Sequence, residues 1–211
     1  MTRLLYITFI VLIWASCTLD ESFHFNSEWS GRYESTFDIS GLTDPLEEGV
    51  DSESSSTPLE QEKVDELVRK LNSTPGISQA SVAQDMEANT LTFAYSFEDI
   101  ESLNRLNAKD LLSKEESPLG SMGRWKMKAK GSKKFTMTME PEEPAQGDNS
   151  EEMMQMGEML QITTKLNFHM PIKKLKSEVA IKGSKSNQII IIYTMADLWD
   201  QDKNWDVNVK F

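Results

Sequence analysis

The stretch RWKMKAKGSKKFTMTM, residues 124–139, decides the fold class that the sequence predicts for this chain. Before Gly131 every second residue is Lys or Arg, and after Phe135 threonine alternates with methionine. Gly131 and Ser132 suit a tight type II′ turn. Alternation with a period of two on both sides of a turn predicts a β-hairpin that buries one face. The residues expected on that buried face are Trp125, Met127, Ala129, Phe135, Met137 and Met139.

The same alternation recurs in other segments. Residues 22–40 predict a second hairpin around a polar turn at 27–31, and residues 91–97 predict a further strand. The continuous apolar run 189–193 is typical of a central buried strand, whereas residues 207–211 alternate again.

Helices are predicted between these strands. Thr57 and Pro58 suit the N-cap and first position of one helix, and Asp99 can cap a second. The methionine-rich segment 151–161 is a third candidate. The predicted fold class is therefore α+β: a mostly antiparallel, curved sheet of hairpins with two or three helices packed on one face.

Residues 1–16 have the parts of an export signal. Arg3 is followed by the apolar run 4–14, and two small residues then precede Cys17. The apolar run is too short to span a bilayer of about 30 Å as a helix. We expect this segment to be removed when the protein is exported.

Removal of the signal leaves residues 17–211, a length that predicts a single α+β domain. Segments near 41–57 and 141–150 have many acidic and few apolar residues, which predicts flexible loops. The net charge of −12 argues against a nucleic-acid partner, because phosphates favour a basic surface.

The stretch IWASC, residues 13–17, resembles the lipobox of bacterial lipoproteins, whose cysteine is acylated and becomes the mature N-terminus. The resemblance implies that Cys17, the one cysteine of the chain, anchors the protein to a membrane of the bacterial cell envelope. Trp14 stands where most lipoboxes carry Leu, so an ordinary secretory signal cut near Ser16 remains the alternative.

Three phrases resemble small bacterial lipoproteins of unknown function, of the LppM-like type and of a Bacteroidetes type. They are ESFHFNSEWSGRYESTFDIS at 21–40, FEDIESLN at 97–104 and HMPIKKLKSEVAIKGSKSNQIIIIYTMADLWD at 169–200. The resemblance implies an envelope domain that holds an apolar ligand, and it supplies no catalytic residues. Asp20 and Glu21 resemble the acidic export tag of Bacteroidetes surface lipoproteins, so we expect the outer membrane.

Methionine is concentrated in one part of the chain, with nine of the twelve residues between Met122 and Met170. Flexible methionine surfaces repack around varied ligands, which favours an apolar ligand or a protein partner here. Ordinary core packing is the alternative. The residues expected to contact such a ligand are Trp125, Met127, Phe135, Met137 and Met139, with Met153 and Met156 on a helical lid.

Catalytic groups are few. His24 and His169 are the two histidines, and Cys17 is not free if it is acylated, so we expect no enzyme and no cofactor. A shared site would require the strands of both histidines to be adjacent.

Two patterns resemble metal sites, but no metal is expected. Asp200, Asp202, Asn204 and Asp206 alternate as in a calcium loop, but the required glycine and glutamate are missing, which favours a polar loop. Thioether ligands suit Cu(I), but core packing is favoured for them. The thioethers in question are those of Met153, Met156 and Met159.

The strand with Arg124, Lys126, Lys128 and Lys130 is basic in an acidic chain. Contact with headgroups or an anionic glycan is one interpretation, and a solvated edge strand that resists aggregation is the other.

The function predicted from these observations is that of a lipid-anchored, non-enzymatic envelope protein that binds an apolar ligand or a protein partner. The alternative is a structural or accessory subunit of an envelope assembly. Ligand binding predicts a deep pocket lined by the methionine and aromatic residues. The alternative predicts that these residues are packed solid and that an apolar patch is exposed elsewhere.

Overall fold

The computed structural model describes residues 18–38, 61–85, 87–108, 124–140, 157–158 and 160–211. Within these residues the chain forms a seven-stranded sheet of order β3-β4-β2-β1-β7-β10-β9 and a four-stranded sheet of order β5-β6-β11-β8. The strands of the larger sheet are β1 (Thr18–Phe25), β2 (Gly31–Asp38), β3 (Ile77–Asp85), β4 (Thr90–Phe97), β7 (Gln161–Asn167), β9 (Ala180–Lys182) and β10 (Gln188–Thr194). Those of the smaller sheet are β5 (Arg124–Lys130), β6 (Lys134–Glu140), β8 (Lys174–Lys176) and β11 (Val207–Lys210).

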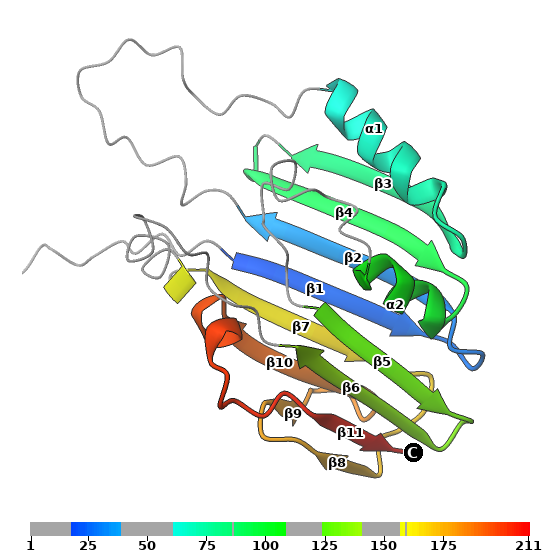
Figure 1. Cartoon of the computed structure of the whole chain (residues 1–211), viewed down its shortest axis with the longest axis vertical. Coiled ribbons are helices and arrows are strands. Elements are labelled where there is room, and N and C mark those ends of the chain that lie inside the picture. The colour runs from blue at the N-terminus through cyan, green and yellow to red at the C-terminus, as the bar shows by residue number, and fades with distance from the viewer. Residues whose placement is uncertain (1–17, 39–60, 86, 109–123, 141–156, 159) are drawn as a thin grey trace, which may run out of the picture.

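The smaller sheet lies over β1, β7 and β10 of the larger sheet (Figure 1). The helix α1 (Gln61–Asn72) runs along β3, and α2 (Ile100–Ala108) lies beside β5. A short 3-10 helix, η2 (Ala196–Trp199), follows β10. The two sheets therefore form a sandwich, and the helices extend its second layer past the edge strand β5.

The core fills the space between the two sheets. Phe25 of β1 lies 5.5 Å from Phe135 of β6, and Trp125 of β5 lies 6.0 Å from Tyr193 of β10, measured between ring centroids. Alternation in each strand turns one set of apolar side chains inward, as a sheet that packs on another sheet requires. The largest fully buried side chains are Phe135, Phe168, Leu19, Leu103, Met127, Met137, Ile162, Leu166, Ile189, Ile191, Leu198 and Val207.

The helix α2 closes the open edge of β5. Asp99 caps it by accepting the backbone N–H of Ser102 at 2.6 Å, and hydrogen bonds from Ser102 lower the pKa of Asp99. The side-chain amide of Asn104 accepts from the N–H of Met127 and donates to its C=O, both at 2.8 Å. Asn104 thus bonds the two backbone groups that a neighbouring strand would otherwise pair.

The predicted fold class is wrong. It placed two or three helices on one face of one curved sheet, whereas a second, four-stranded sheet packs on that face over β1, β7 and β10. Alternation shows that a strand has one apolar face, but it does not show whether a helix or another sheet covers that face. Strand pairing is also not purely antiparallel, because β1 and β7 are parallel.

Both predicted hairpins are confirmed, as β1–β2 and β5–β6. Gly131, with φ of +55°, and Ser132 are the central residues of the second turn. The N–H of Lys133 donates to the C=O of Lys130 at 3.4 Å and closes the turn. Lys130 is the register partner of Lys134, so the loop has three residues, 131–133, instead of the predicted two.

The prediction of a buried strand at 189–193 is only half right. β10 lies between β7 and β9, but no described element covers its outer face, and Ile192 is 53% exposed. No helix in the described part of the chain is long and apolar enough to cross a membrane. The predicted loops near 41–57 and 141–150, Cys17 and nearly all of the segment 151–161 lie outside the described residues.

Candidate functional site: the lysine face of the smaller sheet

The outer face of the four-stranded sheet is covered with lysine. Alternation in β5, β6 and β11 places aromatic residues, methionine and valine in the core and leaves the intervening residues in solvent. None of these strands carries an acidic residue except β6, at its last position, Glu140. The exposed lysines of this surface, which we call the lysine face, are Lys126, Lys128, Lys130, Lys134, Lys174, Lys176 and Lys210.

Strand register aligns four of these lysines in one row across the sheet. Each strand contributes one lysine, and each lysine is the direct register partner of the next. Neighbouring strands are about 4.8 Å apart, and like charges placed directly opposite destabilise a sheet. In the order β5, β6, β11 and β8, the lysine row consists of Lys130, Lys134, Lys210 and Lys174.

Protection of sheet edges explains only part of this row. The prediction that the basic strand β5 lies at an edge is confirmed, and β8 is the opposite edge. Lysine on an edge strand prevents pairing with another chain. Lys134 and Lys210, however, stand on the interior strands β6 and β11, where both backbone sides are already paired. Their position therefore needs a different explanation.

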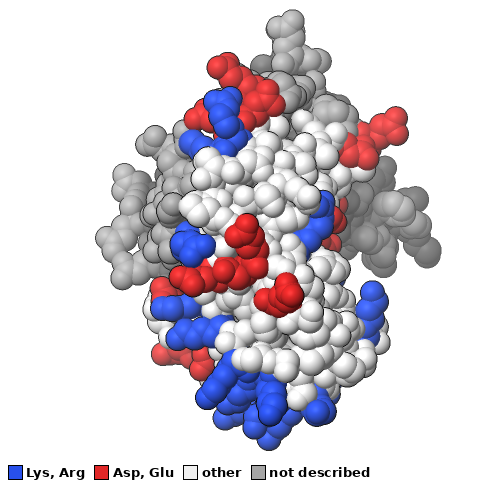
Figure 2. All heavy atoms as spheres, turned by 90° about the vertical axis from the view of Figure 1, so that its right-hand side faces the viewer, with Lys and Arg blue, Asp and Glu red and all other residues white. Residues whose placement is uncertain are grey.

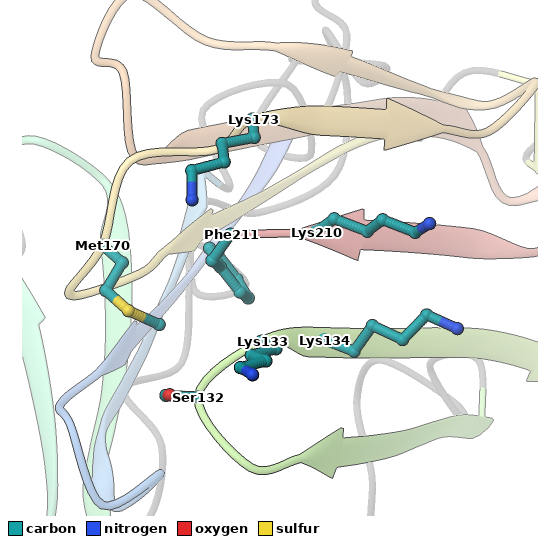
Figure 3. Close-up of a pocket in the computed structure, with 7 residues that line it drawn as sticks. All are labelled: Ser132, Lys133, Lys134, Met170, Lys173, Lys210 and Phe211. Atoms are coloured by element: carbon teal, nitrogen blue, oxygen red, sulfur yellow. The ribbon is translucent and has the colours of Figure 1, made fainter.

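A pocket of about 550 Å³ opens at the end of the row (Figure 3). Lys133 comes from the β5–β6 turn, Met170 follows β7, and Lys173 immediately precedes β8. Figure 3 shows the Phe211 ring between Lys173 and Lys133, and Lys134 and Lys210 side by side on neighbouring strands. The pocket is lined by Ser132, Lys133, Lys134, Met170, Lys173, Lys210 and Phe211.

Backbone hydrogen bonds hold the pocket together. The N–H of Phe211 donates to the C=O of Lys133 at 3.1 Å, and the N–H of Lys173 donates to the C=O of Lys210 at 2.9 Å. The Phe211 ring lies 5.0 Å from the buried Phe168 ring. Elements that are distant in the sequence are thus fixed around one opening.

Trp29 ties the β1–β2 turn to the same end of the molecule. Its φ of +66° is uncommon for a residue other than glycine. Its indole N–H donates to the C=O of Gly131 at 3.0 Å, and its ring stacks 5.7 Å from Phe135. These contacts, together with acceptance of the Glu28 and Ser30 N–H groups by Asn26, stabilise the unusual turn.

Positive charge is concentrated at this end of an acidic protein. Figure 2 shows basic side chains gathered at the bottom of the view, where the smaller sheet lies in Figure 1. Among the described residues, none of the lysines of the face or pocket forms an ion pair. Nine of the chain's 22 Lys and Arg belong to the lysine face and its pocket: Lys126, Lys128, Lys130, Lys133, Lys134, Lys173, Lys174, Lys176 and Lys210.

The described residues that the sequence predicted to contact a ligand lie elsewhere, in the core. They are between 0% and 5% exposed, and none lines the pocket described above. A ligand-binding role for them stays a prediction, as does the role of Met153 and Met156, which lie outside the described residues with Cys17. The core residues concerned are Trp125, Met127, Phe135, Met137 and Met139.

A buried carboxyl group stands in the same core. Glu21 is 5% exposed and accepts hydrogen bonds from the Tyr33 and Thr164 hydroxyls, both at 2.8 Å. Burial raises the pKa of Glu21. Of the two residues that resemble an export tag, Glu21 is therefore in the core, and an exporting role for the pair stays a prediction. Asp20 faces outward and pairs with Lys165 at 3.0 Å.

The two histidines have separate surroundings. His24 is exposed on the outer face of β1, where its Nε2 lies 2.9 Å from the Ser22 hydroxyl. The His169 ring lies edge-on to Trp29, 5.8 Å between centroids, and its Nδ1 has no hydrogen-bond partner. No carboxylate is hydrogen-bonded to either histidine within the described residues.

Polar side chains of the acidic loop after η2 accept hydrogen bonds from backbone groups of the same loop. Asp200 accepts the N–H of Asp202, and Asn204 accepts the N–H of Asp206, both at 3.0 Å. No group of three or more His, Cys, Asp or Glu in the described part of the chain is arranged to hold a metal. Met153, Met156 and Met159, the candidate Cu(I) ligands, lie outside that part.

No protein-family model matches this chain, and no curated protein matches it. Among solved structures, its fold is similar to the NMR structure of the folded domain of LppM from Mycobacterium tuberculosis, with a TM-score of 0.47 and 6% sequence identity. The similarity covers 93% of this chain and 90% of that one. This weak likeness bears out the LppM-like part of the predicted resemblance in part, and nothing found supports the Bacteroidetes part. So distant a likeness assigns neither family nor function.

Sequence reasoning found the lysines of β5 and missed the others. In KLK at 174–176 lysine alternates with leucine, and in VNVK at 207–210 valine alternates with Asn208 and Lys210; this alternation was the available signal. Each phrase is too short to stand out, and only the pairing of β11 with both β6 and β8 places them on one face.

Proposed function

We propose that this chain is a lipid-anchored, non-enzymatic protein of the bacterial envelope that acts by binding a partner at its surface. The observation that carries the proposal is the start of the fold. Thr18, the residue after Cys17, is the first residue of β1. Leu19 is completely buried, and β1 lies between β2 and β7 inside the larger sheet. A cut just before Cys17, as the lipobox predicts, would keep all described residues of this central strand in the mature chain.

The anchor is tested by metabolic labelling with an alkyne analogue of palmitate in a bacterium that processes lipoproteins. We expect label on the unaltered chain and none on Cys17→Ala, which should leave the membrane fraction. Ser16→Gly keeps a small residue before the cysteine and is the matched control that should still be labelled. An unlabelled, soluble wild-type chain would contradict the anchor and support the ordinary secretory signal. Separation of the inner and outer membranes in the same experiment shows which of the two membranes holds the labelled protein.

Binding at the surface is favoured over an enclosed apolar ligand because the described methionine and aromatic residues are packed between the sheets. Native mass spectrometry of the mature chain, purified in a neutral detergent, tests this point. We expect the mass of the lipidated polypeptide alone. A discrete additional mass that is lost on denaturation would identify an enclosed ligand and overturn this part of the proposal.

A second candidate function, that of an accessory subunit in an envelope assembly, is favoured by one apolar patch. Ile181 is 61% exposed and Ile192 is 53% exposed, both on the outer face of the larger sheet near its β9 edge. Ile190 is the direct register partner of Ile181. A photo-crosslinker at position 192 is expected to capture one protein partner if this candidate is correct, and a crosslinker at the exposed Ser184 is the control.

A further inference from the structure

We propose that the lysine face and its pocket bind a linear, phosphate-bearing polymer that lies across β5, β6, β11 and β8. This inference names a ligand class that the proposed function leaves open. The charges of the lysine face are present whether or not Cys17 carries a lipid anchor.

The positive charges of the lysine row are arranged periodically. The lysine row presents one ammonium-bearing side chain per strand, at the strand spacing of about 4.8 Å. A chain molecule that crosses the strands would meet a cation at each step. Lysine binds phosphate as a point charge, which tolerates a flexible polymer better than the fixed fork of arginine does. The row is therefore suited to repeated phosphate groups.

The residues between the lysines are polar. The outward residues that complete the face on β6 and β11 are Thr136, Thr138, Asn208 and, at the end of β6 away from the pocket, Glu140. The hydroxyl and amide groups of the first three can donate hydrogen bonds to phosphate oxygens. The centres of protein–protein interfaces are instead depleted in lysine and enriched in aromatic residues and arginine. No aromatic residue points outward from the described strands of this face. The composition fits a polyanion better than a folded protein partner.

The pocket lies far from the N-terminus that is expected for the mature chain. β7 is parallel to β1, and Met170 follows the end of β7, so the pocket lies at the end of the molecule opposite Thr18. The eight residues of β1 extend over roughly 26 Å, at about 3.3 Å per residue. If Cys17 is anchored, this distance greatly exceeds the Debye length of about 8 Å. The row therefore lies at the end of the fold far from the anchored residue, which favours a polymer over the headgroups of that membrane.

The pocket lies at one end of the lysine row. Ser132 and Lys133 come from the turn, and Lys173 comes from the segment before β8, so the pocket adds two lysines and a hydroxyl beyond the row. Figure 3 shows the ring of Phe211 at the centre of this group, with Met170 beside it. Backbone hydrogen bonds connect Lys133 to Phe211 and Lys173 to Lys210, so the site is formed before a ligand arrives.

The experiment measures binding of fluorescently labelled inorganic polyphosphate to the mature chain, purified in a neutral detergent, by fluorescence anisotropy at several salt concentrations. The test variant is Lys134→Gln/Lys210→Gln, which removes the two interior members of the row. The matched control is Lys165→Gln/Lys185→Gln, which changes the net charge equally but lies outside the face. Thermal melts verify folding, which the loss of like charges should not impair.

We expect the test variant to bind at least tenfold more weakly and the control to change less than twofold. The slope of log affinity against log salt should fall by about 1.4 in the test variant, since each lost phosphate contact contributes about 0.7. Equal losses in both variants, or no binding by the wild-type chain, would overturn the proposal. Because labelling at Cys17 is measured separately, this failure is distinct from failure of the proposed anchor.

Two other polyanions separate the ligand classes. Poly-glutamate represents an acidic protein segment, and vesicles of equal parts phosphatidylglycerol and phosphatidylcholine represent a membrane. We expect poly-glutamate to bind more weakly than polyphosphate at equal charge concentration, and we expect Lys134→Gln/Lys210→Gln to bind vesicles as well as the wild-type chain does, because the acyl anchor inserts in both proteins. Tighter binding of poly-glutamate would show that the face recognises an acidic protein, and vesicle binding that is lost in the test variant would show that the face contacts a membrane. Either result would contradict the proposal of a phosphate-bearing polymer.

Discussion

Glu21 lies in the core, where its carboxyl group needs hydrogen bonds from the protein in place of those it makes to water when unfolded. The Tyr33 and Thr164 hydroxyls supply two hydrogen bonds, yet burial is the larger effect and raises the pKa of Glu21. Burial and the nearby Glu21 also raise the pKa of Tyr33. Burial therefore favours a neutral carboxylic acid inside the sandwich, while the two hydroxyls partly oppose it by stabilising the carboxylate.

Replacement of Glu21 by Gln is expected to change the pH dependence of stability. The unfolded carboxyl group loses its proton near its ordinary pKa of 4.5, while the folded protein keeps the proton to higher pH. The free energy of unfolding contributed by Glu21 therefore falls as pH rises from about 4.5 through the raised pKa, by up to about 1.4 kcal/mol per pH unit. Glu21→Gln should lack this fall.

Urea unfolding of both proteins between pH 4.5 and pH 7.5 checks this expectation. The variant should gain stability relative to the wild-type protein as the pH increases. Parallel pH curves for the two proteins would show that the carboxyl group titrates equally in the folded and unfolded states. Glu34→Gln, which removes an exposed carboxylate from the neighbouring strand, is the control for the loss of one acidic group.

At the scale of elements, the edge of β5 depends on one side chain of α2. Removal of the Asn104 amide in Asn104→Ala leaves the N–H and C=O of Met127 without their partners in a half-buried place. We expect the free energy of unfolding to fall by about 1–3 kcal/mol. Asn208→Ala, in an exposed position of β11, should change it by less than about 0.5 kcal/mol. Equal effects in chemical denaturation would contradict the bridging role of Asn104.

The lysine row is also a property of elements, since it arises from the register of four short strands. Lys134→Thr should raise the free energy of unfolding by up to about 1 kcal/mol at low salt, because it relieves repulsion from Lys130 and Lys210. The gain should disappear at about 1 M salt, where charges are screened within about 3 Å. A variant that is less stable than the wild-type protein at low salt would contradict repulsion in the row.

At the scale of the whole molecule, an aromatic cluster joins the two sheets. Phe168 is 2% exposed and lies 5.6 Å from Phe25 of the larger sheet and 5.1 Å from Phe135 of the smaller one. Phe168→Ala is expected to lower the free energy of unfolding by about 3–5 kcal/mol. Tryptophan fluorescence and far-UV circular dichroism should still report one shared transition. Two separate transitions would show that the sheets fold independently.

The sequence predicted the local parts of this molecule with good success. The two hairpins, the Asp99 cap and the turn at Gly131 and Ser132 follow from periodicity and capping chemistry, which act over a few residues. The division into two sheets was not predicted, because an apolar strand face packs equally well under a helix or a sheet. Ile192 shows the same limit, since an apolar run does not reveal which of its faces stays open.

The candidate site shows where local information ends. The sequence by itself determined the alternation of each strand, the excess of acidic residues and the lipobox-like start, because these depend on residue order alone. Only the tertiary structure decided that lysines 76 residues apart, Lys134 and Lys210, stand side by side and that Glu21 is buried. Register between distant strands is set by the packing of their apolar faces, and that packing depends on the whole chain at once.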